Sequence, residues 1–331
     1  TYLFGDVNGN GVVRELMVSP AGDVPPFFTW EAFRATLRET YDSFGDHSPH
    51  NDLLAEHVAS IDVDIDGAGV DTYLAYLDAV PRIADVMSEI VNDNDYDRLV
   101  VVPILLSSST HTQEVSDQIE ESAPMTGGLE LSVAAPFYEV PFMRDRIAEA
   151  IFAMVDDVGQ SVPEGTPEEE IGILLAAHGT PYLPADPELG WREGDIYSDL
   201  SVVESEFHDH LAAELPWVVR TGRMNYATPS IEESLAEFEA DGIEHVLVIP
   251  SAFPTAAMHT MWDVAEPSVG RAVTPDEGVV SHTRPSGMSV HYSAEGSADL
   301  ERGRESFRAG LEFIAESALQ DLLADGSGTR P

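Results

Sequence analysis

The chain has 331 residues, of which 43% are hydrophobic, so it is long enough to form two ordinary domains with buried cores. Its 60 acidic residues against 16 basic residues, all of them arginine, give a net charge of −44, and the lack of a basic stripe excludes nucleic acid as a partner. The absence of cysteine excludes disulfides, thiolate zinc sites and cysteine-ligated iron–sulfur clusters, so any metal must be held by histidine, carboxylate or backbone oxygen.

The acidic residues are spread along the whole chain rather than gathered in one block. A block or patch would indicate a cationic partner, whereas an even spread is typical of a protein adapted to molar salt. At about 1 M salt the Debye length is ~3 Å, which screens most of the repulsion between like charges. Since no uncharged run is long enough to span a membrane and no signal peptide is apparent, we expect a protein of a halophile's cytoplasm.

Strands and helices alternate in the first half of the chain. A helix is predicted over residues 51–60, a strand over 61–65 and a second helix over 73–91, whose apolar residues recur at helical spacing. The apolar run over residues 98–103, which ends in Pro103, is typical of a fully buried strand in a parallel sheet.

The second half repeats this order. A buried strand is predicted over residues 245–250, which again ends in proline, and a further apolar run over 171–177 leads into His178. Between these two strands we predict a helix, a strand and a helix, over residues 205–215, 217–221 and 229–238. His208 and His210 are two positions apart in the first of these helices and would point to different faces, so we expect both at the surface.

The alternation of strands and helices implies parallel βαβ units, and a repeat offset of about half the chain implies two similar domains. The predicted fold class is therefore α/β, with two similar, flavodoxin-like domains that are each a parallel sheet flanked by helices. A stretch rich in Gly, Pro, Thr and Glu over 159–170 marks the boundary. The predicted domains are residues 1–158 and 159–323, the second closing with a helix over 306–323, followed by a disordered tail over 324–331.

Three histidines follow the buried strands. His178 comes directly after its strand, whereas His111 and His259 lie eight and nine residues beyond the prolines that end theirs. Open α/β sheets bind ligands at the carboxyl ends of their strands, so His178 and His259 are expected to converge on one crevice between the two domains. The half that contains His111 has no matching second histidine, and we therefore place a single site in the second half.

Two carboxylates follow His259 at helical spacing. Asp263 and Glu266 lie four and seven residues after it, so all three side chains would share one face if this stretch is helical. Two imidazoles with carboxylates suit a borderline divalent ion such as Fe²⁺, Co²⁺ or Ni²⁺. In so acidic a chain, the alternative is that Asp263 and Glu266 are solvated surface residues without a role in metal binding.

Four motifs carry a resemblance to a known family. The segment Leu174-Leu-Ala-Ala-His178-Gly-Thr-Pro181 is similar to its strand-to-histidine motif, and residues 103–111 to a proline-led stretch before a metal-binding histidine. Residues 44–49 are similar to a Gly-Gly-x-Ser-Pro motif, and residues 250–263 to a loop that ends in a catalytic glutamate. In order and spacing they resemble the class II tetrapyrrole chelatases, which comprise protoporphyrin ferrochelatase and the sirohydrochlorin cobalt and iron chelatases.

The chain departs from the ferrochelatase pattern at two places. His259 stands at the position of the ferrochelatase glutamate, which is closer to the cobalt-type enzymes. Phe4-Gly5 stands where a second His-Gly pair would be, and this departure again leaves the first half without a histidine pair.

The resemblance implies a chelatase-like fold in which a planar tetrapyrrole is held between the domains and bent, exposing its pyrrole nitrogens. His178 and His259 would bind the metal and accept a pyrrole proton, with His111 as a further candidate ligand. Asp263 and Glu266 would carry hydrated metal inward or protons outward. The candidate contacts to the macrocycle and its carboxylates are Thr180, Tyr182, Arg223, Met224, Asn225, Met258 and Trp262. Met258 and Trp262 would otherwise be core residues.

The predicted function is that of a lyase that inserts Co²⁺ or Fe²⁺, with Ni²⁺ left open, into sirohydrochlorin or a related modified tetrapyrrole. The enzyme would act as a monomer or homo-oligomer, without a membrane span, an organic cofactor or an iron–sulfur cluster. One alternative is a ferrochelatase acting on protoporphyrin or coproporphyrin. Another is a non-enzymatic carrier of tetrapyrrole or metal. A solute-binding protein with two α/β lobes is a third alternative, disfavoured because no export signal is apparent.

Overall fold

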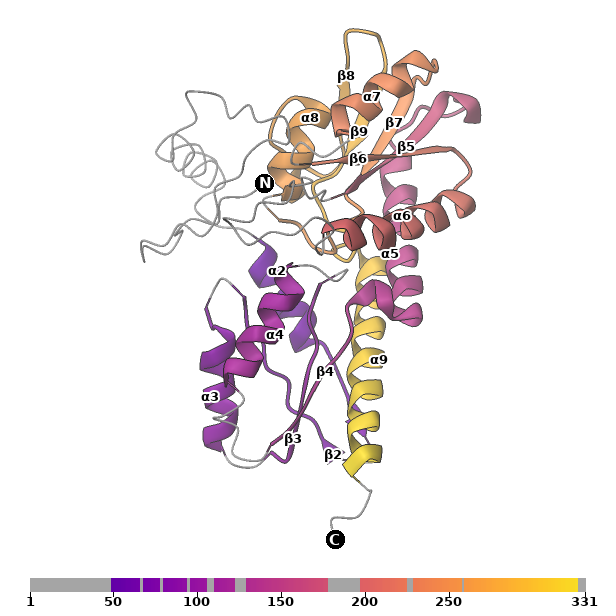
Figure 1. The fold of residues 1–331 in the computed structure, drawn as a ribbon. Coiled ribbons are helices and arrows are strands. Elements are labelled where there is room, and N and C mark those ends of the chain that lie inside the picture. The colour runs from indigo at the N-terminus through magenta and orange to yellow at the C-terminus, as the bar shows by residue number, and fades with distance from the viewer. Residues whose placement is uncertain are drawn as a thin grey trace, which may run out of the picture. The chain divides into compact units, whose positions relative to one another are not determined.

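The computed structural model describes residues 49–65, 68–77, 80–93, 96–105, 110–122, 129–177, 197–224, 229–257 and 259–326 of the chain (Figure 1). These residues form two compact units. The first unit comprises residues 51–152 and 298–326, and the second unit comprises residues 49–50 and 153–297. Each combines parallel strands with helices, which confirms the predicted α/β class.

The second unit is built on a five-stranded sheet of order β6-β5-β7-β9-β8. Its strands are β5 (Ile171–Ala177), β6 (Val218–Arg223), β7 (His245–Ile249), β8 (Val280–Thr283) and β9 (Ser289–Tyr292). Four of them are parallel, and only β8 is antiparallel, at the edge beside β9. The sheet is thus parallel as predicted except at this edge, where a short turn joins β8 to β9 and such a turn allows only antiparallel pairing.

The interior strand β5 is buried at all seven of its residues. It lies between β6 and β7, and its complete burial shows that both of its faces are covered, as its uniformly apolar sequence predicts. Two glycines let helix α7 (Ile231–Ala240) approach this part of the sheet closely. A Cβ on Gly172 would lie 2.5 Å from the Phe238 ring, and one on Gly222 would lie 2.9 Å from the Ile231 backbone.

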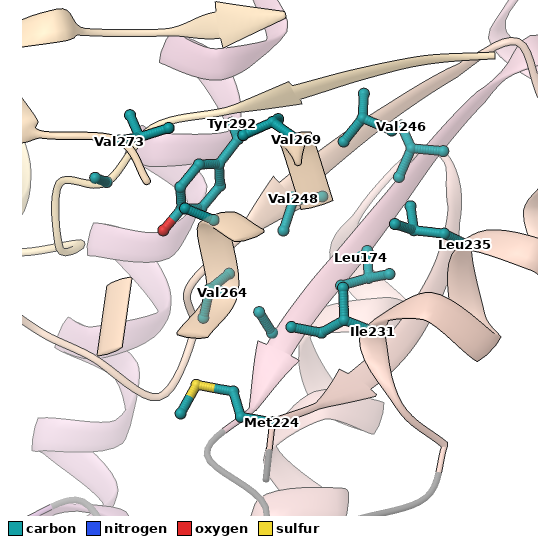
Figure 2. Packing of buried hydrophobic residues seen from close by; sticks show 14 of the residues in the cluster. Leu174, Met224, Ile231, Leu235, Val246, Val248, Val264, Val269, Val273 and Tyr292 are labelled. Atoms are coloured by element: carbon teal, nitrogen blue, oxygen red, sulfur yellow. The ribbon is translucent and has the colours of Figure 1, made fainter. Parts of the chain in front are cut away.

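One apolar cluster joins this sheet to the elements that carry the strand-end loops (Figure 2). Leu174 and Val248 contribute to it from the sheet, and Leu235 contributes from α7. Val264 and Val269 contribute from the residues that follow His259, so the segment beyond β7 is packed onto the core. The apolar side chains buried here leave the strand-end loop little freedom to move away from the sheet.

The remaining helical elements of the second unit follow the same alternation. They are η3 (Glu168–Glu170), α6 (Tyr197–Glu214), the π-helical turn η4 (His259–Val264), α8 (Ala265–Val269) and η5 (Pro275–Glu277). Helix α5 (Pro141–Gly159) contains the division between the units, between residues 152 and 153. The predicted boundary at residue 158 lies six residues from this division.

The first unit has two separate pairs of strands. β1 (Asp64–Ile65) and β2 (Ala68–Gly69) are antiparallel, whereas β3 (Arg98–Val101) and β4 (Glu130–Val133) are parallel. Its helical elements are α2 (His50–Ala59), whose first residue, His50, belongs to the second unit, α3 (Ile83–Asp93), α4 (Thr110–Ser122), η2 (Phe137–Glu139) and α9 (Glu301–Gly326). Within the described residues, the two units therefore share parallel pairing but differ in the number of strands.

The helix predicted over residues 73–91 is wrong in its first part. Helix α3 begins only at Ile83, and residues 73–77 are not helical. Pro81 explains the difference, because proline lacks the N–H that an α-helix requires and clashes with the preceding turn.

The closing helix differs from its prediction in both position and length. Helix α9 packs against β1, β3 and β4 and so belongs to the first unit rather than to a domain of residues 159–323. It extends to Gly326, so residues 324–326 of the predicted disordered tail are helical. Among the helices in the described part of the chain, none is long and apolar enough to cross a membrane.

Candidate active site

The candidate site lies at the carboxyl ends of the parallel strands of the second unit. β5 ends at Ala177, next to Arg223 at the end of β6, and β7 ends at Ile249 on the other side of β5. The chain leaves β7 through Pro250 and reaches His259 at the start of η4. The sheet therefore places His259 beyond the strand ends where open α/β sheets bind ligands.

His259 is paired with Asp263 one helical turn later. The His259 Nδ1 atom lies 2.8 Å from Asp263 Oδ2, and both side chains are about 30% exposed or less. A carboxylate only accepts hydrogen bonds, so Nδ1 carries the proton and donates it to Asp263. The neutral ring then has its lone pair on Nε2, which is the atom that a metal ion or a proton would bind. Carboxylates that orient metal-binding histidines in this way are common beside metal sites.

Trp262, Asp263 and Glu266 follow His259 on the side of the helical segment that is not packed onto the core. Trp262 and Asp263 are half-buried and Glu266 is exposed, whereas Thr260, Met261 and Val264 are buried. This alternation is what helical spacing predicts for one polar face. The turn is π-helical from His259 to Val264, a geometry that is frequent at functional sites.

Buried hydrogen bonds attach this turn to the end of β9. The Thr260 hydroxyl donates to the carbonyl oxygen of Ala294 at 2.7 Å, and the Tyr292 hydroxyl donates to the carbonyl oxygen of Thr260. Gly296 packs directly on the loop that precedes His259, because a Cβ there would lie 2.3 Å from the Thr255 Cα. The position of His259 therefore depends on β9 as well as on β7.

A second imidazole, that of His50, belongs to the same unit and lies near His259. His50 Nδ1 forms a 2.7 Å hydrogen bond with Thr255 Oγ1, which is four residues before His259 in the strand-end loop. Burial, and then the charge that His259 carries when protonated, lower the pKa of His50 to about 4. No role was predicted for His50 from the sequence. The available signal was its position, directly after the motif at residues 44–49.

A family model described as Ferrochelatase matches residues 30–289 of the chain. This protein belongs to the ferrochelatase family. The match covers parts of both units, including the strand ends and the His259–Asp263 pair, so the resemblance to tetrapyrrole chelatases seen in the sequence is confirmed at the level of the family.

The curated relatives of this family member are distant. It is 23% identical over 252 residues to the coproporphyrin III ferrochelatase of Leifsonia xyli, covering 69% of this chain and 64% of that protein. It is 24% identical over 249 residues to the coproporphyrin III ferrochelatase of Nocardia farcinica, covering 70% and 68%. The chain thus spans about two thirds of the length of these relatives, and slightly less for the first.

A solved structure shows the same fold. SirB from Bacillus subtilis, determined with Fe³⁺, superposes with a TM-score of 0.53 at 17% identity, covering 82% of this chain and 90% of that one. At this identity the similarity concerns the fold alone, and it agrees with the chelatase-like fold expected from the sequence.

Several predicted site residues of this family member lie outside the described residues: His178, Thr180, Tyr182, Asn225 and Met258. His111 is on α4 of the first unit, but its side chain is also outside the description. The roles predicted for these residues stay predictions. Within the described residues, no group of three or more His, Asp or Glu side chains is arranged to hold a metal ion.

Besides Trp262, two predicted contacts to the macrocycle can be placed. Arg223 is the last residue of β6 and pairs with Ala177, so it lies at the predicted edge of the sheet. Met224 is only 3% exposed and packs in the apolar cluster (Figure 2), so it contributes to the core, and its predicted contact with substrate stays a prediction. Its backbone N–H donates to Ala177 O, which continues the pairing of β6 with β5 by one residue.

The prediction that His208 is a surface residue is also wrong. His208 lies on α6, is 5% exposed and forms hydrogen bonds with Thr221 and Ser251 at the ends of β6 and β7. The available signal was its helical spacing from Leu211, three residues later, which is also buried on the face of α6 that covers the sheet.

Proposed function

We propose that this protein is a lyase that inserts a divalent metal ion into a tetrapyrrole. The observation that carries the proposal is the His259–Asp263 pair at the strand ends of a ferrochelatase-family fold. Metal insertion requires a ligand that can hold the metal ion, and it releases two protons from pyrrole nitrogens. The Nε2 lone pair of His259 is suited to either task, and Asp263 stabilises the imidazolium that forms if Nε2 takes a proton.

The other residues of the proposed site act around this pair. His178, which directly follows β5, is the proposed second imidazole for the metal. Glu266 is exposed on the same helical face and would bring hydrated metal ions to His259 or carry protons away from it. Trp262 is half-buried in the same segment and would offer an aromatic surface to a flat ring system.

The metal proposed as substrate is Co²⁺ or Fe²⁺. Imidazole nitrogen with nearby carboxylate oxygen suits borderline divalent ions better than Mg²⁺ or Ca²⁺, which prefer oxygen ligands alone. The same preference leaves Ni²⁺ as a further candidate, and a comparison of the three ions in one assay distinguishes them.

The leading tetrapyrrole is sirohydrochlorin or a related modified tetrapyrrole. This choice is supported by His259, which stands where ferrochelatases have glutamate. The second candidate is a porphyrin such as coproporphyrin III, and it is supported by the names of the relatives, which are coproporphyrin III ferrochelatases. The two candidates differ only in the ring that the same site would receive.

The test is metal insertion by the purified protein in molar salt, where its net charge of −44 is screened. Sirohydrochlorin, coproporphyrin III and protoporphyrin IX are each mixed with Co²⁺ or, without oxygen, with Fe²⁺, and insertion is followed by absorbance. We expect many turnovers with one ring and their loss in His259→Ala. Binding of one equivalent without turnover would instead indicate a carrier, and no binding of any ring would refute the proposal.

A further inference from the structure

A buried chain of hydrogen bonds crosses the ends of three neighbouring strands of the second unit. His208 Nδ1 lies 3.0 Å from Thr221 Oγ1, near the end of β6, and His208 Nε2 lies 3.0 Å from Ser251 Oγ, just beyond β7. Ser251 Oγ in turn donates to Ala176 O in β5 at 3.4 Å. His208 and Ser251 are 5% and 2% exposed, so water does not compete for these bonds.

The direction of each bond follows from the number of protons available. The Ser251 hydroxyl has one proton, which it donates to Ala176 O, so it must accept from His208. His208 therefore carries a proton on Nε2. In the neutral imidazole this is the only ring proton, so Nδ1 accepts from the Thr221 hydroxyl, whereas an imidazolium would donate to Thr221 Oγ1 instead. Burial, and then the positive charge of Arg223, lower the pKa of His208 to about 4 and so favour the neutral ring.

These strand ends are the ones that lead to the two predicted metal ligands. Ala176 lies two residues before His178, and Ser251 begins the loop that reaches His259. Among these three hydrogen bonds, only the one from Ser251 to Ala176 O joins β5 directly to the loop that reaches His259. His208 orients the Ser251 hydroxyl for this bond by donating to it. The other hydrogen bond of His208, between Nδ1 and Thr221, connects it to β6, and β6 leads to neither His178 nor His259.

We propose that His208 is a positioning residue for metal insertion, which acts by donating to Ser251 and so aligning the strand ends that precede His178 and His259. The inference rests on the proposed function. Under this proposal, the hydrogen bond from His208 to Ser251 supports the reaction, whereas the hydrogen bond between His208 and Thr221 supports stability alone.

Two substitutions of His208 separate the effects of its two hydrogen bonds. The amide of glutamine can occupy the place of Nε2, whereas the shorter amide of asparagine can occupy the place of Nδ1. His208→Gln therefore keeps the bond to Ser251, and His208→Asn keeps the bond to Thr221. Each variant loses one hydrogen bond of the same length, so a merely structural role predicts equal effects.

The experiment measures Co²⁺ affinity without tetrapyrrole, by calorimetry, and the kcat and KM of insertion with the ring that the wild type uses. We expect His208→Asn to lower Co²⁺ affinity and kcat on the order of tenfold, as loss of groups that orient metal ligands does, and His208→Gln to stay within about threefold of wild type. Ser251→Ala should behave like the asparagine variant, and Thr221→Val like the glutamine variant. This second pair tests the same point if a His208 variant does not fold.

Equal losses of Co²⁺ affinity and kcat in His208→Asn and His208→Gln, and likewise in Ser251→Ala and Thr221→Val, would overturn the positioning role. They would leave the proposed function intact. If the wild type inserts no metal into any ring, the proposed function fails. The order of Co²⁺ affinities among the four variants still tests the positioning role in that case, since it requires no turnover.

Discussion

The imidazole of His259 and the carboxylate of Asp263 are joined by a 2.8 Å hydrogen bond across one turn of the π-helical segment beyond β7. The bond places the ring proton on Nδ1 and the lone pair on Nε2. Removal of the carboxylate should therefore weaken metal binding without a large effect on the fold, because both side chains are partly exposed.

For Asp263→Asn we expect a decrease of about 10- to 100-fold in Co²⁺ affinity or in the rate of insertion. Asparagine can present either an oxygen or an N–H to Nδ1, so the tautomer of His259 is no longer fixed. Asp276→Asn is the matched control, because it removes the same charge from an exposed position of the same unit. A similar decrease in both variants would mean that net charge, rather than the hydrogen bond, supports the activity.

For His50→Ala we expect a decrease of about tenfold in Co²⁺ affinity. His50 contacts Thr255 in the loop before His259, and its removal both loosens the loop and takes away an imidazole near His259. Thr255→Val, which keeps this imidazole, should cause a smaller decrease. Calorimetry at fixed salt measures both, with His282→Ala on the exposed face of β8 as the control. Wild-type affinity in His50→Ala would remove His50 from the site.

For Gly172→Ala we expect the free energy of unfolding of the second unit to fall by about 1–3 kcal/mol. The new Cβ would lie 2.5 Å from the Phe238 ring, and α7 would have to move away from β5. Gly159→Ala is the matched control, since its Cβ would lie 3.7 Å from its nearest neighbours, which is ordinary contact. Urea unfolding followed by tryptophan fluorescence compares the two. Equal midpoints would show that the sheet tolerates a wider helix spacing.

The stability of the second unit should fall as the pH drops from about 6.5 to about 4. Burial lowers the pKa of His208 to about 4, so between these values the unfolded chain binds a proton that the folded chain does not. Above pH 6.5 both states are neutral and this group has no effect, and below about 4 its effect is complete. From pH 7.5 to 5, one such histidine accounts for a loss of about 2 kcal/mol.

His208→Gln isolates this contribution, because glutamine does not titrate. Between pH 7.5 and 5 we expect the variant to lose about 2 kcal/mol less stability than the wild type in urea unfolding, whatever its absolute stability. His282→Ala should keep the wild-type profile, since His282 is exposed. Parallel profiles for wild type and His208→Gln would show that this imidazole binds its proton equally well in the folded and unfolded chain.

Much of the second unit could be predicted from local patterns. The apolar runs identified β5 and β7, and the strand-end position and helical spacing brought His259, Asp263 and Glu266 to one face. The same patterns failed where the decisive contact was distant. They extended a helix through Pro81 in the first unit, and they assigned α9 to the wrong unit, because a closing helix is equally apolar whichever sheet it covers.

The sequence by itself determined the α/β class, the strand ends and the spacing of His259 from Asp263, because periodicity and i, i+4 contacts depend only on neighbouring residues. Only the tertiary structure decided that His50 bonds to Thr255, 205 residues away, and that His208 is buried against Ser251, 43 residues away. The ends of parallel strands meet through the order of the sheet rather than through proximity in the chain. The sequence alone therefore does not reveal the hydrogen-bond partners of these two histidines.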